Sequence, residues 1–161
     1  MLKIKKNILI NASPERVWLF LLELNYSMTM NRSHTNIEFP SSFKPELNST
    51  FTIHQNFAIT KYKFKSKIIS KDPFGTLSIL KTMIGKPNLM HSITYDIALK
   101  GSLVKLDYTL DGSLGSSILE MSLKPIVHGI IIDELRNLKS AIESSNPNMQ
   151  LDTAMKKLNP I

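Results

Sequence analysis

Apolar and polar residues alternate through most of the chain between residues 50 and 112, which is the pattern of half-buried β-strands. Turn signals interrupt the alternation at Asp72-Pro73, at Gly85 and at Gly101. A similar alternation opens the chain over residues 2–10. Strands that are joined by turns this short must be antiparallel. The pattern therefore predicts an antiparallel sheet with one buried face.

A short buried helix is predicted directly after the first strand. Ser13 supplies a capping hydroxyl, Pro14 stands at the first helical position, and Glu15 lies near the positive end of the helix dipole. Residues 17–22 are apolar nearly all round, which indicates burial. Beyond this helix, residues 25–32 predict a second short helix or turn, and residues 34–39 predict a brief strand.

A long amphipathic helix is expected from Ser117 to Glu143, where apolar residues recur at helical spacing. Pro125 should kink this helix or mark a new start, because proline removes a backbone hydrogen bond. A kink, which we favour, would place Ile126 and Ile130, which fall off the main stripe, against the first helix. The alternative is that they form part of an exposed contact for a partner or a second subunit. We expect the buried stripe to contain Ile118, Met121, Pro125, His128, Ile132, Leu135 and Ile142.

The length indicates one domain, and the predicted strands and helices make it an α+β domain over residues 1–145, followed by a polar tail over 146–161. The chain has no cysteine, which excludes disulfides and thiolate zinc sites. Its histidines stand in separate predicted elements, so we expect no metal and no cofactor. No signal peptide and no apolar run of about 20 residues is present, so we expect a cytoplasmic protein.

The formal net charge of +7 raises the question of a polyanionic partner. Lys61, Lys63, Lys65 and Lys67 alternate with residues that include two aromatics, so the lysines should share the outer face of a strand. Nucleic-acid platforms instead combine cations and aromatic rings on one face. We therefore expect no nucleic-acid binding. Docking of this basic face on an anionic membrane or on a protein is an alternative, which predicts association that weakens with salt.

The order of these elements, with three short motifs, resembles the START-like, or SRPBCC, superfamily. The motifs are the opening Ala12–Trp18, a last hairpin over Ser92–Leu110 that turns at Gly101, and the closing helix Leu123–Lys139. The resemblance implies a helix-grip fold, in which a curved antiparallel sheet wraps around a long C-terminal helix. The superfamily includes lipid and sterol carriers and polyketide aromatase/cyclases, so the resemblance also implies an internal cavity.

If this fold is present, the inward residues of the strands and the long helix should line one cavity for a hydrophobic ligand such as a lipid, a quinone or a polyketide-like molecule. The alternative is that they pack on each other as an ordinary core. By strand phase, Gln55 and His91 are also expected to point inward. We predict the ligand-binding residues to be Phe51, Ile53, Phe57, Tyr62, Phe64, Ile93, Tyr95, Ile97, Leu106, Tyr108, Met121, Pro125, His128 and Ile132.

The predicted function is therefore that of a carrier or sensor, either a monomer or a homodimer, in which tyrosines and His128 orient the ligand. An aromatase/cyclase-like enzyme that uses the same cavity is an alternative, since a tyrosine hydroxyl or an imidazole can act as an acid or a base. For that alternative, Tyr95→Phe or His128→Ala should lower turnover and leave ligand binding nearly intact.

Overall fold

One curved antiparallel sheet forms the body of the computed structural model, which describes residues 1–57 and 59–144. Its strands are β1 (Leu2–Ile10), β2 (His34–Glu38), β3 (Thr50–Phe57), β4 (Thr60–Asp72), β5 (Thr76–Met83), β6 (Lys86–Lys100) and β7 (Leu103–Gly112). Their order across the sheet is β1-β7-β6-β5-β4-β3-β2. Consecutive strands from β2 to β7 are therefore neighbours, and β1 pairs with β7.

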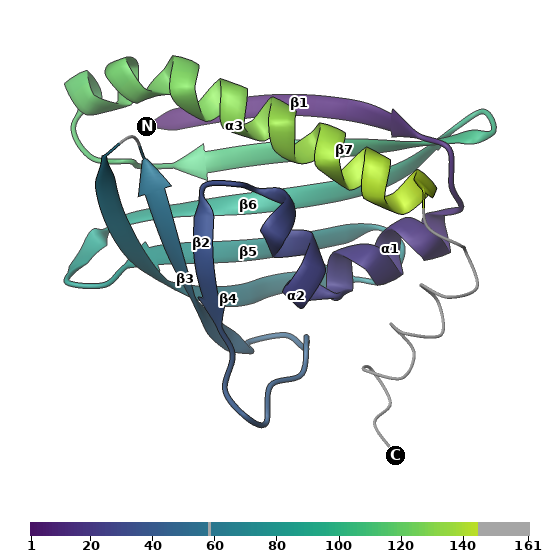
Figure 1. The fold of residues 1–161 in the computed structure, drawn as a ribbon, viewed down its shortest axis with the longest axis horizontal. Helices are drawn as coiled ribbons and strands as arrows, with labels where there is room; N and C mark the ends of the chain where they lie inside the picture. The colour runs from purple at the N-terminus through teal and green to yellow at the C-terminus, as the bar shows by residue number, and fades with distance from the viewer. Residues whose placement is uncertain (58, 145–161) are drawn as a thin grey trace.

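The helices pack against this sheet and close its interior. They are α1 (Pro14–Leu22), α2 (Leu24–Ser27), the 3₁₀ turn η1 (Met28–Met30) and α3 (Ser117–Ser144). In Figure 1, α3 runs along β1 and β7, and α1 lies near its C-terminal half. The predicted α+β helix-grip arrangement is confirmed.

The start of α1 follows the capping prediction. The Ser13 hydroxyl oxygen accepts a hydrogen bond from the backbone N–H of Arg16 at 3.2 Å, and Pro14 occupies the first turn. Val17 and Leu21 are almost completely buried, as the continuous apolar run indicated. This helix therefore anchors the chain between β1 and β2.

The strands bury the faces that the alternation predicted. Along β4, Phe64 and Ile68 are buried, and the intervening lysines are exposed. Two apolar residues that continue the inward phase of their strands are nevertheless exposed, because the chain turns away from the sheet at these strand ends. Ile59 is 99% exposed just beyond β3, and Leu99 is 69% exposed beside the hairpin turn that follows β6.

The buried face of α3 differs from the predicted stripe. Ile118 and Met121 are 79% and 77% exposed, and Pro125 is also exposed, because the first turns of α3 project beyond the ends of β1 and β7 (Figure 1). The helix is continuous through Pro125, so the proline does not mark a new start. The residues that α3 buries are Glu120, Val127, Ile131, Glu134, Leu135, Leu138 and Ile142.

Ile126 and Ile130, which were expected to pack against the first helix, differ in burial. Ile130 packs against the hydrophobic core, and Ile126 is 42% exposed. No helix within the described ranges combines the length and the hydropathy needed to cross a bilayer. The tail predicted for residues 146–161 lies outside the described residues.

Candidate ligand site

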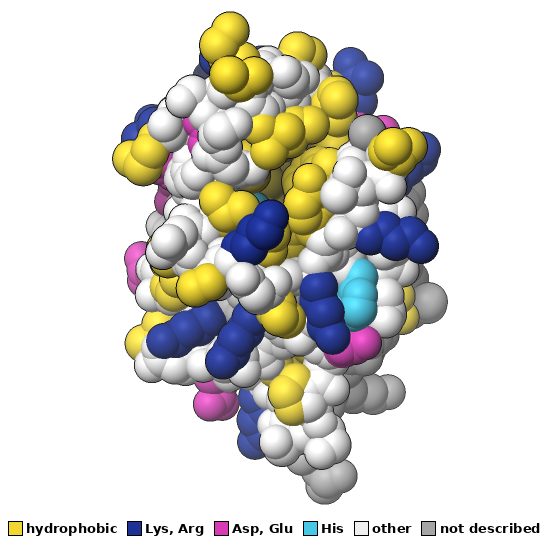
Figure 2. Space-filling view, turned by 90° about the vertical axis from the view of Figure 1, so that its left-hand side faces the viewer, with side chains coloured by type: hydrophobic (Ala, Val, Ile, Leu, Met, Phe, Trp, Pro, Cys, Tyr) yellow, Lys and Arg dark blue, Asp and Glu magenta, His cyan; other side chains and the backbone are white. Residues whose placement is uncertain are grey.

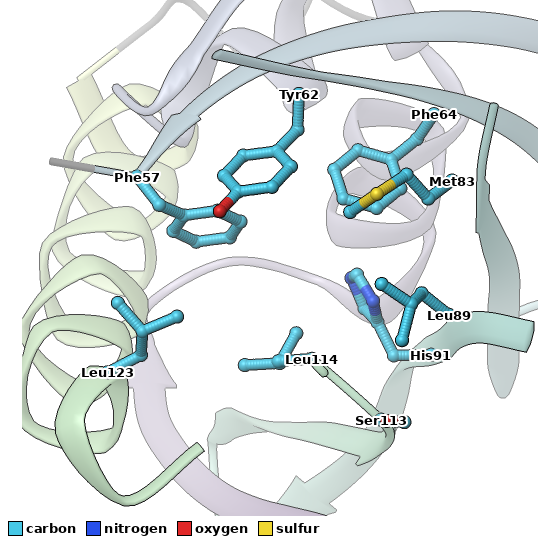
Figure 3. A pocket seen from close by; sticks show the side chains of 9 residues that line it. All are labelled: Phe57, Tyr62, Phe64, Met83, Leu89, His91, Ser113, Leu114 and Leu123. Carbon is cyan, nitrogen blue, oxygen red and sulfur yellow. The ribbon is translucent and has the colours of Figure 1, made fainter. Parts of the chain in front are cut away.

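A small pocket lies at the end of the sheet where β3 meets β4 and β5 meets β6. We call it the end pocket. Figure 2 shows this side of the molecule, where hydrophobic side chains line a hollow that has lysine or arginine side chains around it. The pocket volume is about 10 Å³, close to the lower limit for one water molecule. Its lining residues, shown in Figure 3, are Phe57, Tyr62, Phe64, Met83, Leu89, His91, Ser113, Leu114 and Leu123.

His91 is a polar side chain that lines the end pocket and is buried. It is 2% exposed, and its Nδ1 has no hydrogen-bond partner. Burial, aided by the charge of Lys81, lowers the pKa of His91 to about 3, so the ring is neutral. A neutral imidazole carries one donor and one acceptor nitrogen. His91 can therefore donate a hydrogen bond to a polar group that enters the pocket, or accept one from it.

A second set of polar side chains lies deeper, between the sheet and α3. This buried polar cluster contains Asn31, Ser33, His34, Gln55, Lys81, Tyr95 and Glu134. Lys81 Nζ donates to Gln55 Oε1 at 2.5 Å, and lies 3.3 Å from His34 Nε2 and 4.8 Å from the centre of the Phe64 ring. Because Phe64 also lines the end pocket, the cluster and the pocket are adjacent.

The tautomer of His34 follows from its contacts. Its Nδ1 lies 2.8 Å from the carbonyl oxygen of Met28, and a carbonyl can only accept, so Nδ1 carries the proton. Burial, and then the charge of Lys81, keeps the pKa of His34 well below its usual value. Nε2 of this neutral ring is consequently an acceptor for the ammonium of Lys81.

Glu134 is the acid of the cluster and projects from the buried face of α3. Tyr95 Oη donates to its Oε1 at 2.6 Å, and Asn31 Nδ2 donates to its Oε2 at 3.1 Å. Burial raises the pKa of Glu134 to about 7, and burial lowers the pKa of Lys81 to about 7. Two titratable groups that change charge near neutral pH therefore lie inside the fold.

The predicted site residues fall into four groups. Phe57, Tyr62 and Phe64 line the end pocket, and Tyr95 belongs to the polar cluster, where its ring packs edge-on against Tyr108 at 5.3 Å. A third group, Phe51, Ile53, Ile93, Ile97 and Leu106, lies in or against the hydrophobic core. The last group, on α3, does not reach the pocket: Met121 and Pro125 are exposed, and His128 and Ile132 are half-buried.

Sequence reasoning missed Lys81, Glu134, His34 and Asn31. A signal for Lys81 was present, because it shares strand phase with Leu77 and Ile79, both fully buried. Glu134 likewise stands at helical spacing from Val127, Ile131 and Leu138. Lysine and glutamate are rarely buried, so the pattern alone does not distinguish such positions from breaks in an apolar face.

An open groove of about 470 Å³ lies between α1 and the β4–β5 turn and is lined in part by Trp18, Lys44 and Phe74. Among the described residues, no side chain that lines this groove has a buried polar atom without a hydrogen-bond partner. Within the same ranges, no three His, Asp or Glu side chains come together as a metal site requires.

No protein-family model matches the sequence, and no curated protein matches it. Solved structures do resemble it. A conserved protein from Geobacillus kaustophilus is 15% identical with a TM-score of 0.70, over 88% of this chain and 95% of that one. Ara h 8.0201 is 10% identical with a TM-score of 0.63, over 89% and 98%. Ginseng major latex-like protein 151 from Panax ginseng is 10% identical with a TM-score of 0.63, over 89% and 97%.

These structures include members of the START-like, or SRPBCC, superfamily, so the chain has the START-like helix-grip fold. The resemblance seen in the sequence motifs is thereby confirmed for the fold. At identities of 10–15% the likeness extends to the fold alone.

Proposed function

We propose that this protein binds a hydrophobic small molecule in the end pocket, as a carrier or sensor. The observation that carries the proposal is a buried imidazole, His91, which has an unpartnered Nδ1 and lines a mainly apolar pocket. Apolar pockets with a few polar groups are the usual form of small-molecule sites. The START-like fold supports the same assignment, since strand residues and Leu123 of α3 together line the pocket.

The end pocket must widen to hold a ligand, since its present volume of about 10 Å³ suits one water molecule. The first turns of α3 are suited to this movement. Between Ser117 and Ile126 they bury only Glu120, and Leu123, which faces the pocket, is half-buried. Segments with few buried apolar contacts open at low free-energy cost. Outward displacement of this segment would enlarge the pocket and leave the rest of α3 in place.

The rim of the pocket is also suited to an apolar ligand. Ile84 and Met90, which follow and precede pocket residues of β5 and β6, are 52% and 43% exposed. Met121 on α3 is 77% exposed. Figure 2 shows hydrophobic side chains around the hollow at this end. Such exposed apolar side chains offer a first contact for a molecule leaving a membrane or another protein.

The test is to extract the gently purified protein with solvent and identify the released molecules by mass spectrometry. A stoichiometric hydrophobic compound is expected from the native protein. Leu123→Phe should fill the pocket and reduce the amount recovered, whereas the matched variant Met121→Phe, which places the ring in solvent, should not. Equal loss or equal recovery in both variants would contradict the assignment to the end pocket.

An aromatase/cyclase-like enzyme is the second candidate, and the hydrogen bond between Tyr95 and Glu134 favours it. Glu134 can act as an acid or a base near neutral pH, since burial raises its pKa to about 7. Glu134→Gln should then abolish conversion of an accepted linear polyketide-like compound but preserve its binding. Unchanged conversion in this variant would exclude a catalytic role for this cluster.

A further inference from the structure

The ammonium of Lys81 lies inside the protein without a carboxylate in contact. The side chain is 1% exposed, and no carboxylate oxygen of the described residues lies within 4.0 Å of its Nζ. Its contacts are the neutral oxygen of Gln55, the neutral ring of His34 and the face of Phe64. Buried charges in proteins are normally paired with an opposite charge. The fold thus provides a cation whose direct partner can be an anion from outside the chain.

Glu134 does not take this position. Its two oxygens accept hydrogen bonds from Tyr95 and Asn31, and it acts on Lys81 through its charge rather than by contact. Burial raises the pKa of Glu134 to about 7, so near neutral pH part of the population is uncharged. An uncharged Glu134 does not repel a second carboxylate nearby.

One side chain, Phe64, lies between the end pocket and Lys81. The Phe64 ring lines the pocket, contacts the ammonium of Lys81 with its face, and packs edge-on against His91 at 5.4 Å. In Figure 3, the His91 ring projects toward that of Phe64, and Leu123 and Phe57 face it from across the pocket. Lys81 itself does not line the pocket, so a head group reaches its ammonium only if the Phe64 ring turns aside as the pocket widens. Such a head group would then lie beside an imidazole and an ammonium, and its tail would meet apolar side chains.

We propose that the end pocket takes a hydrophobic carboxylic acid as its anion, with the carboxylate paired to Lys81 and hydrogen-bonded by His91 Nδ1. This inference rests on the proposed function, because it names the ligand class of the same pocket. Lys81 is the one lysine among the described residues that is buried, so a singly charged head group balances it. A dianion such as a phosphate monoester would retain uncompensated charge. A neutral head group would supply no charge to hold the proton on Lys81, whose pKa burial lowers to about 7.

The experiment compares decanoic acid with 1-decanol, which share a tail and differ in charge, by calorimetric titration near neutral pH. The native protein is expected to bind decanoate at least about tenfold more tightly than decanol. Lys81→Met should remove this preference and retain decanol binding. The control is Lys63→Met, which removes the same charge from an exposed position of β4 and should keep the preference.

The outcomes separate the two proposals. If decanol binds to the native protein as tightly as decanoate, or if Lys63→Met removes the preference as fully as Lys81→Met, the acid-specific inference is wrong and the proposed function stands. If neither compound binds, the proposed function itself fails. Circular dichroism of each variant establishes that it is folded before its affinity is measured.

A second measurement needs no substitution. Decanoic acid labelled with ¹³C at the carboxyl group reports its ionisation through its chemical shift when bound to the native protein. We expect the bound carboxyl group to titrate at a lower pH than in free solution, because Lys81 and His91 favour the anion. A titration raised above that of the free acid would show that the pocket takes the neutral acid, and would overturn the inference.

Discussion

Lys81→Met should change how the stability of the protein depends on pH. Burial lowers the pKa of Lys81 from 10.5 to about 7. At pH 7 the folded protein therefore holds this proton about half of the time, whereas the unfolded chain holds it nearly always. Methionine fills a similar volume and has no charge to desolvate. The comparison of native protein and variant isolates the cost of burying one ammonium.

The sign and size of the effect follow from linkage. Between pH 7 and 10.5 the unfolded native chain binds more protons than the folded one, so the stability of the native protein relative to the variant rises with pH. A tenfold change in proton affinity corresponds to about 1.4 kcal/mol. From pH 7 to 10.5, the stability of the native protein relative to the variant therefore rises by about 5 kcal/mol. About 3 kcal/mol of this rise falls between about pH 7 and pH 9.5.

Other groups do not reverse this trend. Loss of the hydrogen bonds that Lys81 donates to Gln55 and His34 costs about 1–3 kcal/mol for each acceptor left unpaired, and this cost does not depend on pH in this range. Without Lys81, the pKa of Glu134 rises further, because the lysine charge lowers it. Ionising Glu134 then destabilises the variant as the pH increases, which acts in the same direction.

The assay is urea unfolding followed by circular dichroism at pH 7, 8.5 and 9.5 for the native protein, Lys81→Met and the surface control Lys63→Met. We expect Lys81→Met to be about as stable as the native protein, or more stable, at pH 7, and to lose about 3 kcal/mol relative to it by about pH 9.5. The control should track the native protein. A stability difference for Lys81→Met that is constant with pH would refute the argument that Lys81 is buried with a lowered pKa.

Three further results are expected. Affinity for decanoate should fall from about pH 6 to about pH 8.5, as Lys81 and Glu134 lose protons, and a flat calorimetric profile would contradict this. Gly112→Ala should destabilise the protein by at least about 2 kcal/mol more than Gly101→Ala in urea unfolding. Both glycines have a positive φ, but a Cβ at residue 112 would meet backbone at 2.5 Å, whereas one at residue 101 would meet open space. Tyr95→Phe should raise the pH at which Glu134 titrates by NMR, since the hydroxyl lowers its pKa.

The sheet could be predicted from the sequence because strand alternation is a local signal. Each strand of β3–β7 carries its own inward face, and β4, β5 and β6 end at recognisable turns, so neither signal depended on the rest of the fold. The start of α1 was local in the same sense, since Ser13 and Pro14 act within one turn of helix. These elements, in order, were sufficient to indicate the helix-grip fold.

The face of α3 could not be assigned in the same way, because it depends on what the sheet presents to the helix. Glu134 is buried since Tyr95 from β6 and Asn31 from the segment before β2 supply hydrogen bonds to it. Those partners are far from Glu134 in sequence. Conversely, Ile118 and Met121 are apolar and exposed because the first turns of α3 extend beyond the sheet. Of the candidate site, Phe57, Tyr62, Phe64 and Tyr95 were among the residues predicted from the sequence. Lys81, His34, Asn31 and Glu134 were not, because their burial depends on tertiary pairing.

The pairing of β1 with β7 also has a consequence for how the chain folds. Leu2 aligns with Gly112, so the first strand finds its neighbour only after nearly all of the sheet has been synthesised. Long sequence separation between contacting strands slows folding, and partly folded sheets expose apolar surface that promotes aggregation. We therefore expect the pairing of β1 with β7 to limit the rate of refolding. The nascent protein should depend on chaperones until α3 covers the interior.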